Sequence, residues 1–241
     1  MGESPTEEEA FDLRKRAEEL RPQVEASSKE PLFVEFAGSP KSGKSTCIEV
    51  VRHFFRRTGY RILAPTEGAS KRTPFYLRDD LVSFNAWSAC YAISNVLEAM
   101  HHSDRYAVAL LDRGIFDALA WFELLHADRQ LSDSDQQSIN SFLMLDKWRA
   151  QIGLVVLLTA DADTSMKREN VDKLIFEAGR AMNPDFLGRL REAYGVIENR
   201  YASTFPKVEV IDTSDKAQVR LKEVSYRVTS VILDLLEERL K

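Results

Sequence analysis

The chain has 241 residues, of which 44% are hydrophobic and 29% are charged, so it can bury the core of one large domain and stay soluble. Its formal net charge of −5 argues against bulk nucleic-acid binding, which usually goes with a basic excess. Two cysteines are too few for a disulfide framework, and no apolar run approaches the ~20 residues of a membrane span. The first 30 residues also lack the apolar segment of a signal peptide, so we expect a cytoplasmic protein.

The beginning of the chain differs in composition from the rest. From Glu7 to Leu20 it is rich in Glu, Arg and Lys with few apolar positions, which predicts a helix, and Pro22 and the serines from Ser27 predict a linker. We interpret residues 1–30 as a charged, partly helical N-terminal extension. Either this extension is solvated or it serves as a dimerisation or docking arm. Residues 31–241 form the main domain in this interpretation.

Strand and helix patterns alternate through the main domain. Short apolar runs with β-branched and aromatic residues predict five strands, at Leu32–Ala37, Tyr60–Ala64, Ala107–Leu111, Gly153–Thr159 and Val208–Ile211. Helical periodicity predicts the segments between them, at Thr46–Arg57, Leu81–Met100, Phe116–Leu125, Asp133–Ala150 with Ser132 as N-cap, Pro184–Tyr201 and Ala217–Leu240. This alternation predicts an α/β protein whose parallel sheet is covered on both faces.

A phosphate-binding motif follows the first predicted strand. The pattern G-x-x-x-x-G-K-S stands directly after a strand and opens a helix, which is the context that the motif requires. Gly38 and Gly43 permit backbone geometry that a Cβ would obstruct, so the loop amides and the following helix N-terminus can surround anionic oxygens. The expected nucleotide-binding residues are Gly38, Ser39, Pro40, Lys41, Ser42, Gly43, Lys44, Ser45 and Thr46.

This motif predicts a purine nucleoside triphosphate bound as its Mg²⁺ complex. Lys44 would reach the β- and γ-phosphates, and the Ser45 hydroxyl would face Mg²⁺. The second half of the chain lacks an Asn-Lys-x-Asp guanine signature, which favours ATP over GTP. The loop alone does not distinguish a kinase from a GTPase, a motor or an ATP-gated switch.

Three further segments resemble the thymidylate kinase and deoxynucleoside kinase group of P-loop proteins. They are Val108–Gly114 (VALLDRG), Leu154–Glu169 (LVVLLTADADTSMKRE) and Val208–Ser214 (VEVIDTS). The resemblance covers roughly Leu32 to Leu236. It implies a three-layer P-loop fold with a five-stranded parallel sheet in the order 2-3-1-4-5 and a lid segment. Residues 31–241 would thus be a P-loop kinase-like domain, and a homodimer would be a common assembly in this group.

The resemblance also assigns roles to individual residues. Asp112 would hold Mg²⁺ together with Ser45, and Arg113 would meet the acceptor or its phosphate. Basic residues of the lid would close over the transferring phosphate: Lys167, Arg168, Lys173 and Arg180. From the residues alone, Asp112 could instead cap a helix, Arg113 could be a structural ion-pair partner, and Arg168 could lie on a solvated helix face.

Two positions depart from the pattern of thymidylate kinases. Pro40 stands where these enzymes usually carry a carboxylate that contacts the acceptor nucleotide. The Arg-Glu-Pro that usually follows the second strand is replaced by Pro65 to Gly68, which retains Glu67 but has no Arg. These departures argue against dTMP as acceptor. Glu67 could act as the base on a 5′-hydroxyl, as in deoxynucleoside kinases, or be a solvated loop acid.

The stretch from residue 70 to residue 87 would line the acceptor site by the same resemblance. An aromatic side chain there could stack on a base, and an amide could read its edge, while core packing or solvation are the alternative roles. The substrate-binding candidates are Arg72, Phe75, Arg78, Phe84 and Asn85, together with Arg113.

We therefore expect an ATP- and Mg²⁺-dependent phosphotransferase that transfers the γ-phosphate to a nucleoside monophosphate or a nucleoside. The candidate catalytic residues are Lys44, Arg113, Arg168 and Glu67. One alternative is a kinase for another acceptor, such as a small metabolite or a modified base in DNA, with nucleic acid entering only as the acceptor. The other is a non-catalytic protein that uses bound ATP to recruit a partner.

Overall fold

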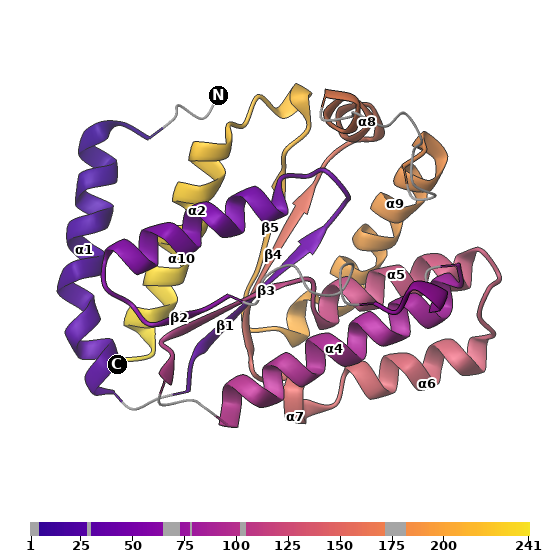
Figure 1. Ribbon diagram of the computed structural model, residues 1–241, viewed down its shortest axis with the longest axis horizontal. Helices are drawn as coiled ribbons and strands as arrows, with labels where there is room; N and C mark the ends of the chain where they lie inside the picture. Colours follow the sequence, from indigo (N-terminus) through magenta and orange to yellow (C-terminus); the bar gives the residue numbers. More distant parts are fainter. Residues whose placement is uncertain (1–4, 28–29, 65–72, 78, 102–104, 172–181) are drawn as a thin grey trace.

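The computed structural model describes residues 5–27, 30–64, 73–77, 79–101, 105–171 and 182–241. Its centre is a five-stranded parallel sheet (Figure 1). The strands are β1 (Leu32–Gly38), β2 (Ile62–Leu63), β3 (Val108–Asp112), β4 (Ile152–Thr159) and β5 (Val208–Asp212). Their order is β2-β3-β1-β4-β5, which confirms the predicted topology.

Helices cover both faces of this sheet. They are α1 (Glu7–Ala26), α2 (Lys44–Arg57), α4 (Leu81–His101), α5 (Ile115–Ala127), α6 (Asp133–Leu143), α7 (Asp146–Arg149), α8 (Ala162–Val171), α9 (Pro184–Tyr201) and α10 (Leu221–Glu238). Short 3₁₀ turns add η1 (Phe75–Leu77), η3 (Ala202–Thr204) and η4 (Asp215–Ala217). None of the described helices is long and apolar enough to cross a membrane.

Alternating side chains of β1 enter two separate cores. Val34 and Phe36 pack into the core with α1, α2 and α10, while Phe33 and Ala37 pack into the core with α4, α5 and α9. All four side chains are fully buried, as expected for a central parallel strand that is covered on both faces. The sheet is therefore the middle of three layers, and the predicted α/β class is confirmed.

The N-terminal helix α1 belongs to one of these cores. Its side chains Leu13, Ala17 and Leu20 are buried in the core that α10 and α2 share. The predicted linker at Pro22 is wrong, because the helix continues through this proline to Ala26. Proline lacks one backbone donor and usually interrupts a helix, but tertiary packing of the apolar face outweighs that cost here.

The helix predicted over Asp133–Ala150 is two helices in the structure. α6 begins at its expected N-cap Ser132, whose hydroxyl accepts from the Asp135 amide at 3.1 Å. α6 ends at Leu143, and the backbone of Leu145, with φ −57° and ψ 129°, is not helical before α7 begins. The indole of Trp148 donates to the Leu143 carbonyl at 3.0 Å and so satisfies an acceptor at this helix end.

Candidate active site

The phosphate-binding loop joins β1 to α2 at the carboxyl edge of the sheet, where ligands bind in such folds. Gly38 has φ 131°, and a Cβ there would lie 1.8 Å from the Leu158 carbonyl oxygen of β4, so only glycine fits. Gly43 has φ 93°, and Lys41 takes a positive φ of 59° although it carries a side chain. The sequence motif therefore has the backbone shape that a phosphate-binding loop needs.

Lys44 is buried inside the loop. Its ammonium donates to the carbonyl oxygens of Gly38 and Ser39, both at 2.7 Å. This arrangement holds a positive charge within the turn of the loop, directly beside the N-terminus of α2. Both features favour an anion at this position.

Two oxygen ligands suited to Mg²⁺ lie at the mouth of the loop. The Ser45 hydroxyl is 3.4 Å from the Asp112 carboxylate at the end of β3. A hydroxyl and one carboxylate, completed by phosphate oxygens and waters, are the kind of set that Mg²⁺ prefers. Among the described residues there is no cluster of three His, Cys, Asp or Glu side chains that could hold a metal without such a ligand. The site therefore fits Mg²⁺ that arrives with a nucleotide.

The loop opens into a cavity of about 610 Å³. Its lining residues come from the loop, β3, α8 and the turn after β5, and they are Pro40, Lys41, Gly43, Lys44, Ser45, Thr46, Asp112, Arg113, Lys167, Arg168, Val171 and Asp215. Five of them are basic and two are acidic, so the cavity is positive although the whole chain carries −5. This contrast favours a strongly anionic ligand such as a triphosphate.

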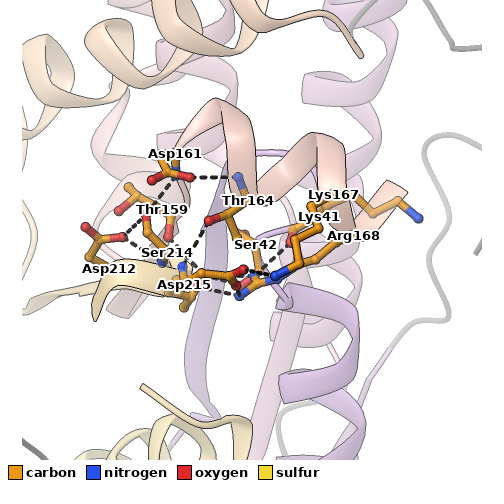
Figure 2. A network of polar contacts seen from close by, with 11 residues as sticks. Lys41, Ser42, Thr159, Asp161, Thr164, Lys167, Arg168, Asp212, Ser214 and Asp215 are labelled. Carbon is orange, nitrogen blue, oxygen red and sulfur yellow. Dashed lines mark hydrogen bonds and ion pairs between the residues drawn. The ribbon is translucent and has the colours of Figure 1, made fainter. Parts of the chain in front are cut away.

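Arg168 of α8 is fastened to the loop (Figure 2). Its guanidinium donates to the Lys41 carbonyl at 3.1 Å and to the Thr213 carbonyl at 2.6 Å. The Thr213 hydroxyl lies 2.9 Å from the Ser42 carbonyl and 3.0 Å from the Thr159 carbonyl, so the turn after β5 also contacts the loop. The alternative that Arg168 only lies on a solvated helix face is therefore wrong.

Acids balance the basic residues of α8. Asp215 lies 2.6 Å from the Lys167 ammonium and 3.6 Å from the Arg168 guanidinium (Figure 2). The hydrogen bond from Lys167 is the main reason that the pKa of Asp215 lies below its ordinary value. Lys41 pairs with Glu169 at 3.0 Å. These contacts join α8, the phosphate loop and the turn after β5 in one polar network.

A second polar cluster lies behind the loop. Asp117 of α5 is buried, and its Oδ1 accepts from the Gly38 amide at 3.1 Å and from the Tyr194 hydroxyl at 2.6 Å. Its Oδ2 accepts from Arg113 at 2.8 Å. Arg113 has a positive φ of 66°, and its guanidinium also lies over the Trp121 ring, 5.5 Å from the ring centre. Arg113 therefore forms the structural ion pair considered above, with Asp117, and it also lines the cavity.

Glu35 of β1 completes this cluster. It is fully buried and accepts from the amides of Phe116 at 3.2 Å and Asp117 at 2.8 Å, at the start of α5. Burial raises the pKa of Glu35 to about 7, although these amide hydrogen bonds oppose the rise. The close approach depends on Gly114, where a Cβ would lie 2.5 Å from the Glu35 carboxyl.

Of the predicted acceptor residues that the structure describes, Arg113 lines this cavity and the other three do not. Phe75 is 81% exposed in η1, Phe84 is half-buried, and Asn85 is buried with its amide donating to the Leu81 carbonyl of its own helix. Five other predicted site residues lie outside the described residues, namely Glu67, Arg72, Arg78, Lys173 and Arg180.

Sequence reasoning missed Glu35, Asp117, Tyr194 and Thr213. Two of them carried a visible signal. Glu35 is a lone charge within the apolar strand LFVEFA, and Asp117 is a lone charge within the apolar helix start IFDALAWF. A charge in such a position is seldom buried unless it is paired, so it indicates a structural or functional partner. Tyr194 carries no comparable signal, and Thr213 lies in the segment Val208–Ser214, to which the resemblance gave no individual residue roles.

No protein-family model matches the chain, and no curated protein matches it in sequence. Solved structures of deoxyadenosine kinase from M. mycoides are similar to it in fold. The structure with bound dCTP gives a TM-score of 0.57 at 15% identity and covers 83% of this chain and 98% of the kinase chain. The same coverage holds for the structure with the products dCMP and dCDP (0.57, 14%) and for that with bound dATP (0.56, 14%). The chain therefore shares the P-loop fold of a deoxynucleoside kinase.

Proposed function

We propose that the protein is an ATP- and Mg²⁺-dependent phosphotransferase that phosphorylates a nucleoside or a nucleoside monophosphate. One observation carries this proposal: the Ser45 hydroxyl of a complete phosphate loop faces Asp112, and Arg113 follows on the same cavity wall. A donor nucleotide and its acceptor would thus meet between the loop and the end of β3. The fold shared with deoxyadenosine kinase supports this reading.

Phosphoryl transfer depends on alignment and on neutralising the charge of the transferring group. Lys44 would move its ammonium from the loop carbonyls to the β- and γ-phosphate oxygens. Arg168 would bring positive charge from the α8 side, and Arg113 would hold the acceptor. Ser45 and Asp112 would hold Mg²⁺, which when bound draws charge from the phosphate oxygens.

The acceptor is the finer part of the proposal. Pro40 cannot supply the side-chain carboxylate with which thymidylate kinases contact their nucleotide, and this favours a nucleoside over dTMP. The similar structures are of a deoxyadenosine kinase, one of them with dCMP among its products. With a hydroxyl as acceptor, a carboxylate is needed to take its proton, and Glu67 is our candidate for this base.

Turnover of ATP with Mg²⁺ tests the proposal against deoxynucleosides, nucleoside monophosphates and a DNA oligonucleotide. Lys44→Ala serves as the blank, and Lys15→Ala serves as the control because Lys15 lies on the exposed side of α1. We expect one acceptor class to be phosphorylated by the wild type and by Lys15→Ala, with no product from Lys44→Ala. Binding of ATP without turnover on any acceptor would refute the kinase and favour an ATP-gated binding protein. Phosphorylation of DNA alone would shift the acceptor to a base in DNA.

A further inference from the structure

The carboxylate of Asp117 joins three parts of the candidate site. It receives the Gly38 amide from the phosphate loop, the guanidinium of Arg113 from the end of β3, and the Tyr194 hydroxyl from α9. The residue is only 2% exposed. Because a buried carboxylate needs several donors, these three bonds fix one another's positions.

Tyr194 also contacts Gly38, the loop residue whose amide binds Asp117. Its hydroxyl lies 2.6 Å from Asp117 Oδ1 and 3.0 Å from the Gly38 carbonyl oxygen, and its one proton serves both acceptors. Burial, reinforced by the charge of Asp117, raises the pKa of Tyr194 well above its ordinary value. Tyr194 therefore remains a phenol, and the amide and carbonyl groups of Gly38 are both held by the pair of Asp117 and Tyr194.

The other end of this connection is Arg113. Asp117 and Trp121 are four residues apart and lie on one side of α5, and Arg113, which precedes the helix, contacts both of them. The guanidinium is held between the Asp117 carboxylate at 2.8 Å and the Trp121 ring at 5.5 Å. A shift of Asp117 would therefore move Arg113 and Gly38 relative to each other.

We infer that Tyr194 and Asp117 are positioning residues that set the distance between the phosphate loop and Arg113. The inference rests on the proposed function, in which the loop holds the donor phosphates and Arg113 holds the acceptor. Misplacement of reacting groups by about 1 Å can cost on the order of 10²-fold in rate. The pair acts on the alignment of donor and acceptor, and neither residue touches the reacting atoms.

The test compares two buried tyrosines that each lose one hydroxyl. Tyr194→Phe removes the bonds to Asp117 and Gly38. Tyr60→Phe is the matched control, because Tyr60 is 3% exposed and donates to the Ala17 carbonyl of α1 at 2.9 Å, away from the cavity lining. Tyr60→Phe should lower Tm by about 2–4 °C, and Tyr194→Phe should lower it by more, because it also leaves the buried Asp117 carboxylate with one donor fewer.

The kinetic constants should then separate the two variants. Measured well below both melting midpoints, Tyr194→Phe should lower kcat by about tenfold or more and change the KM for ATP by less than about threefold, because alignment matters most in the transition state. Tyr60→Phe should leave kcat within about twofold of the wild type. Equal kcat values for the two variants would show that Tyr194 is only structural and would overturn the inference.

A second readout does not need turnover. In a chain with Trp87→Phe and Trp148→Phe, Trp121 is the one tryptophan left, and it contacts Arg113. Saturating Mg²⁺-ATP should change the fluorescence of Trp121 in the chain that keeps Tyr194. In the chain that also carries Tyr194→Phe, the fluorescence change at equal ATP occupancy should be clearly smaller. Equal changes, or no change in either chain, would overturn the positioning role. If the fluorescence changes differ between the two chains, but the wild type binds ATP and phosphorylates no acceptor, the proposed function alone is refuted.

Discussion

Replacing Glu35 by glutamine should change how the stability of the fold depends on pH. Burial raises the pKa of Glu35 from its usual value of 4.5 to about 7, so the folded protein binds a proton that the unfolded chain releases between these two values. Stability from this group is fully present below about pH 4.5 and is lost as pH rises through 7. At pH 8 this difference in pKa lowers the free energy of unfolding by roughly 3 kcal/mol.

Glu35→Gln cannot ionise, so its free energy of unfolding should lack this loss. We expect urea unfolding at pH 5, 6, 7 and 8 to show a falling free energy for the wild type and a nearly flat one for the variant. The variant's stability relative to the wild type should therefore rise from pH 5 to pH 8 by roughly 2.5 kcal/mol. The control Glu98→Gln replaces an exposed acid of α4 and should keep the wild-type slope. Equal slopes for wild type and Glu35→Gln would refute the argument.

Two more variants test contacts around the loop. Gly114→Ala places a Cβ 2.5 Å from the Glu35 carboxyl and should lower the free energy of unfolding in urea by about 1–3 kcal/mol. The control Gly195→Ala adds a Cβ that meets no atom within 4 Å and should be neutral or stabilising. An unchanged urea midpoint for Gly114→Ala would contradict the predicted clash. Arg168→Lys cannot span the Lys41 and Thr213 carbonyls and should lower kcat by about tenfold or more, while Arg227→Lys on α10 should not. Equal kcat values for Arg168→Lys and the wild type would contradict this role of Arg168.

The sequence predicted the fold well because its patterns are local. Five strand-like runs between helical segments were enough for the α/β class, and the strand order followed from the family resemblance. The two errors have a common origin, since tertiary contacts decide both. Pro22 stays in α1 because Leu13, Ala17 and Leu20 of this helix are buried in the core. The break after Leu143 lacks a Gly or Pro that would mark it.

The candidate site was only half visible in the sequence. The phosphate loop is one contiguous motif, so its residues could be named in advance. The bonds that hold it join positions far apart in the chain, such as Gly38 with Tyr194, and they depend on the packing of α9 against the core beside β1. A lone Glu35 in an apolar strand indicates a buried partner but cannot identify it.

Two cavity residues with side chains, Lys41 and Arg113, have positive φ angles of 59° and 66°. Such backbone costs of the order of 1–3 kcal/mol at each position, and glycine or asparagine would adopt it more easily. Selection for heat resistance alone would therefore favour replacing these two cations, and each replacement would weaken the positive cavity. Stability and phosphate recognition compete at the same two positions, so a thermostabilised version of this protein should be screened for activity at each step.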